Sequence, residues 1–413
     1  MAEVATPIGL KGIKTIRDFE LADKVVFLRL DLNVPLKDGK ITDETRIQAS
    51  LPTIRYAMEK GAKLVLASHL GRPKSAADKQ FSLEPVALRL QDLLGVEVIL
   101  FDDPKSDAIK SVIKALRKNQ IVLLENLRFE PGETKNDIEF AQVIANYTQV
   151  YINDAFGASH RAHATIVALP ELVKEKGIGF LIEKEVHVLD RLLQNPEKPY
   201  VAILGGSKVS DKIGVLEKLV DVVDGFIVGG AMAYTFLKAR GVSVGQSLVE
   251  TDKLNYAREM MARLDARGKT LLLPVDHVIS QDFAGTKDVK TTTGVAIEDG
   301  SLGLDIGPKT IRLYTQAIAE AKTVFWNGPM GVFENPLFCK GSFAVAKAMA
   351  ENKGFKVVGG GDSAAAAEAS GYASQMSHIS TGGGASLEYL EGARLPGLEV
   401  LRSKNRSTPA VSK

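Results

Sequence analysis

Glycine clusters in the second half of the chain are the first residues whose spacing suggests chemistry. Each cluster follows a short β-branched run and precedes a stretch with helical spacing. A glycine turn at a helix start exposes backbone N–H groups at the positive end of the helix dipole, so a phosphate can approach closely. Any one cluster could be only a tight turn, but four in one half favour a nucleotide site. They occupy residues 205–208, 229–231, 359–363 and 382–385.

The kind of nucleotide site is less clear from these clusters. A P-loop is absent, because Arg263 stands where the first glycine should precede Gly268-Lys269-Thr270. Residues 359–364 fit a relaxed dinucleotide pattern, but no acidic residue follows at the expected distance of about twenty positions. Asp362 stands where a helix should begin, and it could cap that helix or carry Mg²⁺ against phosphates. Its spacing alone leaves both roles open.

Two lysines beside the first glycine cluster suit several phosphates. Lys208 and Lys212 are four residues apart and share one face of a starting helix. Lysines on a helix face are usually only solvated, so this pair by itself is weak support.

The first half of the chain carries a set of arginine, histidine and small polar residues. All but Arg46 lie at or just beyond the end of an expected strand, where ligands bind in open parallel sheets. The arginine fork grips carboxylate and phosphate groups, so Arg72, Arg128, Arg161 and His69 could converge on one anion, although any single arginine could be surface charge. The set is Asp31, Asn33, Arg46, His69, Arg72, Arg128 and Arg161.

Hydrolase and metalloenzyme patterns are missing. His160 and His163 have no carboxylate or cysteine neighbours at ligand spacing, and neither H-E-x-x-H nor G-x-S-x-G occurs.

The elements that must position these residues alternate between short strands and amphipathic helices. We expect strands at 24–30, 63–67, 97–101, 121–124 and 150–153, and again at 200–204, 225–228, 270–274, 323–326, 355–358 and 378–380. This alternation predicts an α/β fold with parallel, doubly wound sheets. Helical spacing between residues 179 and 199 predicts a helix that links two such domains.

Composition agrees with an ordinary globular protein of two or three domains. The chain has 413 residues and a net charge of +2, so no global field gathers nucleic acid or an anionic membrane. Apolar runs are far shorter than the roughly 18 residues that cross a bilayer. A lone Cys339 and the lack of a signal-like N-terminus favour a cytoplasmic protein.

Eight segments now identify a family that the chain resembles, phosphoglycerate kinase, from about Thr15 to about Val400. They occur in the family's order at residues 29–35, 69–73, 125–129, 154–157, 204–209, 326–334, 359–362 and 380–384. The resemblance implies reversible, Mg²⁺-dependent phosphoryl transfer between 1,3-bisphosphoglycerate and ADP, giving 3-phosphoglycerate and ATP, in a cytoplasmic monomer. It also implies a direct in-line transfer, without a phosphoenzyme.

The resemblance further implies two Rossmann-like domains that close about a hinge helix. We expect a phosphoglycerate-binding domain at 1–183, the hinge at 184–199, a nucleotide-binding domain at 200–398, and a tail at 399–413 that could pack on the first domain.

The family's functional residues carry over by motif position. The arginine and histidine set above would hold phosphoglycerate, with Arg46, Lys208, Gly361 and Gly383 as the catalytic positions and Asp362 as the metal ligand. The nucleotide side would comprise Gly205, Lys208, Lys212, Gly229, Gly303, Leu304, Asn327, Glu334, Gly360, Gly361, Asp362 and Ser363. Ser363 replaces a threonine common in the family but keeps the hydroxyl, and Tyr389 stands where a smaller aliphatic residue is common.

Two other hypotheses remain at this point. A dinucleotide-dependent dehydrogenase could be built on residues 359–364, and a non-catalytic protein could use the arginine set to hold an anion. The presence of Lys208, Arg46 and Asp362 argues against the second.

Overall fold

The computed structural model describes residues 8–403, and the chain divides into two compact units. The first unit comprises Met1–His187 with Arg394–Lys413, and the second comprises Val188–Ala393. The boundary falls inside helix α7 (Phe180–Gln194), which confirms the helix predicted from the spacing between residues 179 and 199.

The first unit is built on a six-stranded parallel sheet of order β5-β6-β4-β1-β7-β8. A hairpin of β2 (Leu36–Lys37) and β3 (Lys40–Ile41) follows the first strand. The sheet strands are β1 (Val25–Leu30), β4 (Lys63–Ala67), β5 (Glu97–Phe101), β6 (Gln120–Leu124), β7 (Val150–Asp154) and β8 (Glu175–Ile178). All but β8 were predicted from β-branched runs; β8 reads Glu-Lys-Gly-Ile and lacks that signal.

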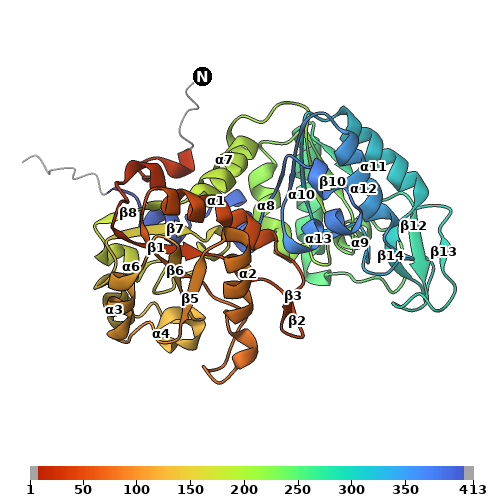
Figure 1. Cartoon of the computed structure of the whole chain (residues 1–413). Coiled ribbons are helices and arrows are strands. Elements are labelled where there is room, and N and C mark those ends of the chain that lie inside the picture. Colours follow the sequence, from red (N-terminus) through yellow and green to blue (C-terminus); the bar gives the residue numbers. More distant parts are fainter. Residues whose placement is uncertain (1–7, 404–413) are drawn as a thin grey trace, which may run out of the picture. The chain divides into compact units, whose positions relative to one another are not determined.

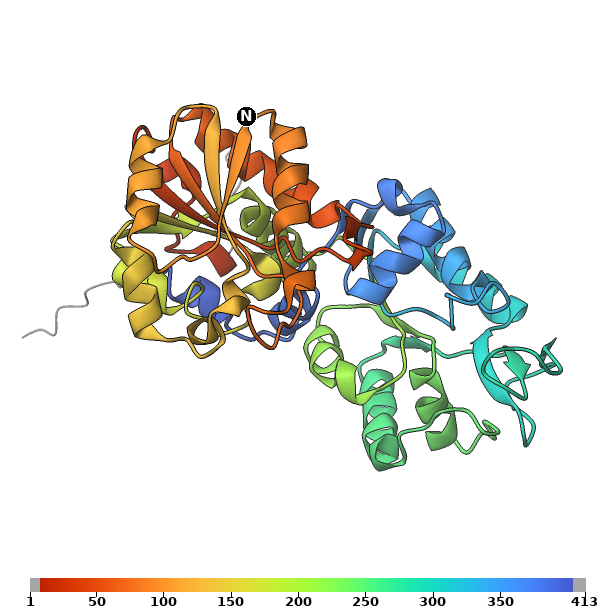
Figure 2. The same ribbon diagram turned by 60° about the horizontal axis from the view of Figure 1, so that its bottom comes forward.

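Helices cover both faces of this sheet (Figures 1 and 2). Alternate strand residues such as Val26 and Leu28 join one core cluster with Ile54 of α1 and Leu90 of α2. Phe27 and Tyr151 point to the opposite face, where their rings stack 6.0 Å apart. Burial on both faces explains why these strands are almost continuously apolar. The helices are α1 (Thr45–Glu59), α2 (Glu84–Leu94), α3 (Ala108–Ala115), α4 (Pro131–Thr134), α5 (Ile138–Ala145), α6 (Ala168–Leu172) and α15 (Pro396–Glu399).

The second unit has a six-stranded parallel sheet of order β11-β10-β9-β15-β16-β17. In chain order this is 3-2-1-4-5-6, the arrangement of a doubly wound nucleotide-binding fold, whose ligands bind where the order reverses. The reversal lies between β9 and β15. The strands are β9 (Tyr200–Leu204), β10 (Gly225–Val228), β11 (Thr270–Leu272), β15 (Thr323–Asn327), β16 (Phe355–Val358) and β17 (His378–Ile379).

A small antiparallel sheet, which the sequence did not predict, adds to the second unit (Figure 1). It consists of β12 (His277–Ser280), β13 (Lys290–Thr291) and β14 (Leu302–Ile306). The helices of this unit are α8 (Ile213–Leu219), α9 (Met232–Ala239), α10 (Leu254–Ala266), α11 (Pro308–Glu320), α12 (Lys340–Glu351), α13 (Gly361–Ala369) and α14 (Gly384–Leu390).

The chain returns to the first unit through α15. The Gly397 N–H donates to the Ser159 carbonyl at 2.9 Å, and Asn153 Nδ2 donates to the Gly397 carbonyl at 3.2 Å. Farther on, Arg402 Nη2 donates to the Gly9 carbonyl at 2.9 Å. The part of the expected tail beyond residue 403 lies outside the described residues.

The close approach at Gly397 gives a test of this return segment. A Cβ at this position would lie 2.8 Å from Ile166 Cγ2 and 3.0 Å from Ser159 Cα, so Gly397→Ala should lower the free energy of unfolding by about 1–3 kcal/mol. Gly294 has nothing within 4 Å of its Cβ position, and Gly294→Ala should change stability by less than about 1 kcal/mol. Urea unfolding followed by circular dichroism measures both variants; equal stability would show that α15 is not tightly seated.

Candidate active site

The carboxyl edge of the first unit's sheet gathers the predicted anion-binding residues. Asp31 follows β1 and is nearly buried, and its carboxylate accepts a hydrogen bond from Arg46 of α1. Asn33 Oδ1 accepts from the Gly71 N–H at 2.8 Å, so the segment after β1 is tied to the segment after β4.

Arg128 joins the same edge from the turn after β6. Its Nη1 donates to the Gly71 carbonyl at 2.5 Å, and its own N–H is held by Asn126 Oδ1 at 3.1 Å. Burial lowers the pKa of Arg128 to about 10, helped by the positive charges of Arg161 and Arg29 and, more weakly, of Arg72. Such crowding of cations is unfavourable unless an anion neutralises it.

His69 lies at the centre of this charge. The ring is almost fully buried, and burial together with Arg29, Arg128, Arg161 and Arg46 holds its pKa well below the usual range. His69 is therefore neutral at physiological pH.

The remaining two arginines lie nearer to solvent. Arg161, which follows β7, donates from Nε to His160 Nε2 at 3.1 Å, and Arg72 is exposed. The structure thus brings all seven predicted residues of the set to one edge of the sheet.

In the second unit, backbone packs directly on backbone at the carboxyl ends of β9 and β15. A Cβ at Gly205 would lie 2.2 Å from the Pro329 carbonyl oxygen, and a Cβ at Gly328 would lie 2.2 Å from the Gly205 oxygen. Only glycine permits this approach. At the end of β10, a Cβ at Gly229 would strike Met330 Sδ at 2.4 Å.

Asn327 connects this edge to the lysine segment. Its Nδ2 donates to the Gly359 carbonyl at 2.6 Å, and its Oδ1 accepts from Lys212, which lies in the 3₁₀ turn Ser210–Lys212. Burial lowers the pKa of Lys212, while the nearby charges of Asp211 and Asp362 oppose that shift. Lys208, on the preceding loop, is exposed.

Helix α13 begins at the third glycine cluster. Gly360, with φ of 88°, occupies the N-cap position, so Asp362 is not the cap and the capping alternative for it is wrong. Gly361 and Asp362 are exposed in the first turn, whereas Ser363 is buried and its Oγ accepts from the Gly328 N–H at 2.5 Å. This hydrogen bond connects the start of α13 to the segment that follows β15. Gly383, with φ of 54°, similarly precedes α14.

A pocket of about 310 Å³ opens beside this edge. Gly303, Leu304 and Glu334, all predicted, line it together with Asp362. The sequence did not single out Tyr234, Ser247, Leu248 and Phe283, which also line the pocket. Phe283 is 64% exposed at its wall, an isolated aromatic residue in a loop that no spacing pattern marks.

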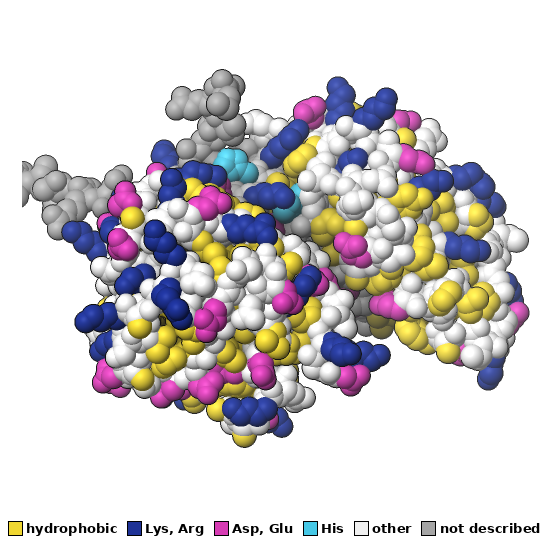
Figure 3. Space-filling view, in the orientation of Figure 1, with side chains coloured by type: hydrophobic (Ala, Val, Ile, Leu, Met, Phe, Trp, Pro, Cys, Tyr) yellow, Lys and Arg dark blue, Asp and Glu magenta, His cyan; other side chains and the backbone are white. Residues whose placement is uncertain are grey.

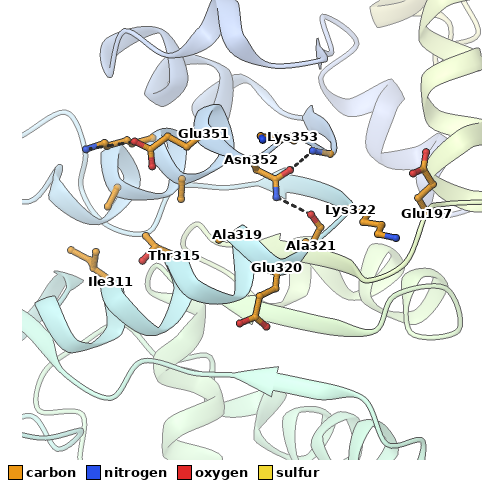
Figure 4. Close-up of a pocket in the computed structure, with 14 residues that line it drawn as sticks. Glu197, Ile311, Thr315, Ala319, Glu320, Ala321, Lys322, Glu351, Asn352 and Lys353 are labelled. Carbon is orange, nitrogen blue, oxygen red and sulfur yellow. Dashed lines mark hydrogen bonds and ion pairs between the residues drawn. The ribbon is translucent and has the colours of Figure 1, made fainter.

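A larger pocket of about 760 Å³ lies elsewhere in the second unit, between α11 and α12 (Figure 4). Ala319, Ala344 and Ala348 are among the residues that line it. Lys322 and Gly354, which also line it, directly precede β15 and β16, so the pocket is at the amino edge of the sheet. Ligands of such sheets bind at the other edge, and this pocket is not the candidate active site.

Lysine and arginine are interspersed with aspartate and glutamate on the visible face of each unit (Figure 3). Among residues 8–403, no group of three histidine, cysteine, aspartate or glutamate side chains could hold a metal ion, and no helix is long and apolar enough to cross a membrane.

Comparisons with known proteins decide the family. The phosphoglycerate kinase family model matches residues 16–393. The chain belongs to the phosphoglycerate kinase family. It is 68% identical over 398 residues to a phosphoglycerate kinase of Bdellovibrio bacteriovorus, covering 96% of this chain and 99% of that protein. It is 54% identical over 393 residues to one of Anaeromyxobacter, covering 94% and 99% respectively.

Solved structures agree with this assignment. The phosphoglycerate kinase of Coxiella burnetii has a TM-score of 0.85 at 41% identity, with 94% of this chain and 98% of that chain covered. That of Pyrococcus horikoshii has a TM-score of 0.81 at 33% identity, with the same coverage. The protein is therefore a kinase with the two-domain fold of phosphoglycerate kinases, and the dehydrogenase alternative is not supported.

Glu250 holds the lysine loop of this kinase. Its Oε2 accepts from the N–H groups of Val209, at 2.5 Å, and Ser210, at 3.1 Å, and its Oε1 accepts from Ser210 Oγ at 2.6 Å. These bonds position the segment between Lys208 and Lys212.

Glu250→Ala should reduce kcat/KM of the kinase reaction by roughly 10- to 100-fold, because the lysine loop loses its anchor. Glu250→Gln, which keeps an acceptor oxygen, should recover much of the loss. Glu259→Ala, an exposed position on α10, is the matched control and should behave like the unaltered enzyme. Unchanged steady-state kinetics in Glu250→Ala would contradict this role.

The buried carboxyl group of Asp154 should make the stability of the protein depend on pH. Asp154 ends β7, and its Oδ1 accepts from the N–H groups of Leu181, at 2.9 Å, and Ile182, at 3.2 Å, at the start of α7. Burial raises the pKa of Asp154 from 3.8 to about 7, so the folded state keeps a proton that the unfolded chain has lost over this interval. This group therefore lowers stability as pH rises from about 4 to about 7.

Asn cannot lose that proton, so Asp154→Asn should gain stability relative to the unaltered enzyme as pH rises through this window, by on the order of 1–4 kcal/mol. Urea unfolding at several pH values measures the difference. Parallel stability curves for the two proteins would contradict the assignment.

Proposed function

We propose that this kinase transfers a phosphoryl group reversibly between 1,3-bisphosphoglycerate and ADP, giving 3-phosphoglycerate and ATP. In the reverse direction the acceptor is a carboxyl group. The observation that carries this proposal is the cluster of arginines around neutral His69, which calls for a strongly anionic small molecule.

The first unit would bind the phosphoglycerate. Arg72, Arg128 and Arg161 would grip an anionic group beside His69, while Asp31 and Asn33 position the segment after β1. Arg46, which the Asp31 carboxylate holds, would reach toward the transferred phosphoryl group.

The second unit would bind the nucleotide at the carboxyl edge of its sheet. Its helix starts and glycine turns suit phosphates, since the backbone N–H groups face outward without a Cβ in the way. The 310 Å³ pocket lined by Tyr234, Leu248 and Phe283 is apolar enough for a base, and Glu334 at its edge suits a ribose hydroxyl. Gly205, Gly229, Gly303 and Leu304 would line this side, with Asn327, Lys212, Gly360, Gly361 and Ser363 near the phosphates.

Mg²⁺ is part of the proposal, with Asp362 as its protein ligand. Mg²⁺ commonly takes one or two carboxylates and completes its shell with substrate phosphates and water, which fits a site with one exposed acidic side chain beside the nucleotide pocket. The ion would neutralise phosphate charge.

The reaction needs positioning and charge neutralisation, and it needs no protein nucleophile. The bond between the phosphorus and the carboxyl oxygen of the acyl phosphate breaks as a β-phosphate oxygen of ADP bonds to that phosphorus. The leaving group is the carboxylate of 3-phosphoglycerate. Negative charge spreads over the equatorial oxygens of the group in flight, where Lys208, Arg46 and the N–H groups near Gly361 and Gly383 would stabilise it.

We further propose that the substrate sites close about a hinge at residues 184–199, which includes most of α7. Closure would exclude water, which would otherwise hydrolyse the acyl phosphate. We propose a cytoplasmic monomer; light scattering of the purified protein tests the monomer.

The reaction is tested by ATP-dependent phosphorylation of 3-phosphoglycerate, coupled to a dehydrogenase that consumes the acyl phosphate. We expect robust turnover that EDTA abolishes, because the metal neutralises the nucleotide. Lys208→Ala should lower kcat at least 100-fold, roughly the effect of removing one group that stabilises transition-state charge, and leave phosphoglycerate binding nearly unchanged.

Lys218→Ala, in α8, is the matched control and should retain full activity. Equal activity of Lys208→Ala and Lys218→Ala would refute the role of Lys208. A folded protein that binds both ligands without turnover would favour the anion-binding alternative.

A further inference from the structure

Arg29 is a buried arginine whose role the proposed reaction does not use. It lies in β1, its side chain has no exposed area, and all three of its nitrogen groups are engaged. Nε donates to Thr165 Oγ1 at 2.9 Å, and Nη1 donates to the Leu30 carbonyl. Nη2 lies 3.3 Å from Nδ1 of His69.

Glu133 of α4 compensates the charge of Arg29. Its Oε1 lies 3.8 Å from Arg29 Nη2, and neither side chain is exposed. The Glu133 carboxylate also accepts from Thr165 through the N–H, at 3.0 Å, and through the hydroxyl, at 2.7 Å. A charge pair this deeply buried, with further hydrogen bonds on both partners, has little freedom to rearrange.

The guanidinium constrains the proton on His69. A guanidinium has only donors, so a hydrogen bond to it requires a lone pair on Nδ1. We infer that Arg29, held by Glu133, is a positioning residue that keeps His69 in the tautomer with its proton on Nε2. This inference rests on the proposed function in one respect, since it takes the ligand of His69 to be phosphoglycerate.

The tautomer matters because the site binds an anion. An imidazole with its proton on Nε2 can donate from that nitrogen to a phosphate or carboxylate oxygen, whereas the other tautomer would present a lone pair to the anion. Burial and the charges of Arg128, Arg161 and Arg46 keep the pKa of the ring low. His69 therefore serves as a neutral donor, and the substrate can bind without proton uptake at this ring.

The tautomer is measurable in the full-length protein without any substrate. Long-range ¹H–¹⁵N correlation spectra of uniformly labelled enzyme at pH 7 distinguish a protonated from an unprotonated ring nitrogen. The signals of His69 are identified by their loss in His69→Gln. We expect a neutral ring with the proton on Nε2; a cationic ring, or a proton on Nδ1, would overturn the inference.

A paired substitution tests whether Arg29 is the cause. Removing one partner would leave a buried charge uncompensated, so Arg29→Met is combined with Glu133→Gln. The His69 ring should lose its preference for the Nε2 proton, and KM for 3-phosphoglycerate should rise roughly 10- to 100-fold while KM for ATP stays within about twofold. An unaltered tautomer in the folded double variant would overturn the inference.

The matched control removes another ion pair, between a lysine and a glutamate, from the same unit. Lys24 and Glu175 are 2.7 Å apart at the opposite, amino ends of β1 and β8, and Lys24→Met with Glu175→Gln should change neither the tautomer nor KM. If the Arg29 variant does not fold, the spectrum of the unaltered enzyme still decides. Because that spectrum needs no turnover, a protein with the Nε2 proton but no kinase activity would refute the proposed reaction and leave this inference standing.

Discussion

Repulsion among cations is the constraint on which the first unit's site depends. Arg29, Arg46, Arg128 and Arg161 all bring positive charge to His69, and the pKa values of His69 and Arg128 are both lowered as a result of burial and this charge. Asp31 and Glu133 compensate only part of it, through Arg46 and Arg29 respectively. The fold must therefore hold these groups together by other means, and an anion bound among them would relieve the repulsion.

The stabilising forces come from the sheet beneath. Every residue of β7 is buried, and β1 is buried along all but its first residue. The carboxyl ends of β1, β4, β6 and β7 then lie at a common edge because all four strands are parallel neighbours in one sheet. Hydrogen bonds of the Asn33 and Arg128 side chains with the Gly71 backbone connect the loops that follow, so a rigid scaffold presents charges that would otherwise separate.

The second unit, in the proposed reaction, has to bring polyanionic phosphates close to the backbone. Gly205 and Gly328 let the ends of β9 and β15 touch, and Gly360 lets α13 begin beside Asn327. Side chains at these positions would separate the strand ends and bury the N–H groups. One unit thus offers arginine side chains and the other offers glycine backbone, as expected for a kinase that holds two anionic substrates.

Much of this organisation could be predicted from the sequence. Apolar runs such as residues 25–28 and 200–204 identify central strands, because strands buried on both faces need no polar alternation. Arginines at the strand ends of the first unit and glycine clusters at those of the second unit then indicate the candidate site edge of each sheet. The weaker elements were missed: β8 contains lysine and glycine, and β12 to β14 are short antiparallel strands whose sequence follows no strong period.

Side chains that act through tertiary contacts also could not be predicted from the sequence. Glu250 lies 38 positions after Lys212, and Glu133 lies 104 positions after Arg29, so no local spacing connects either pair. Phe283 stands in a loop without a pattern, and only the folded chain places it at the pocket beside the carboxyl edge of the second sheet. The N-cap of α13 is Gly360 instead of Asp362, because the glycine turn that begins the helix lies two residues before the charged side chain.

The central claim is that the arginine cluster of one unit and the glycine edge of the other bind different ligands. Calorimetric titration of Arg128→Met with 3-phosphoglycerate and, separately, with ADP tests it most directly. The account predicts that phosphoglycerate affinity falls at least tenfold, about 1.4 kcal/mol, while ADP affinity is unchanged. Loss of ADP affinity to the same extent, or no loss of either in the folded variant, would contradict it.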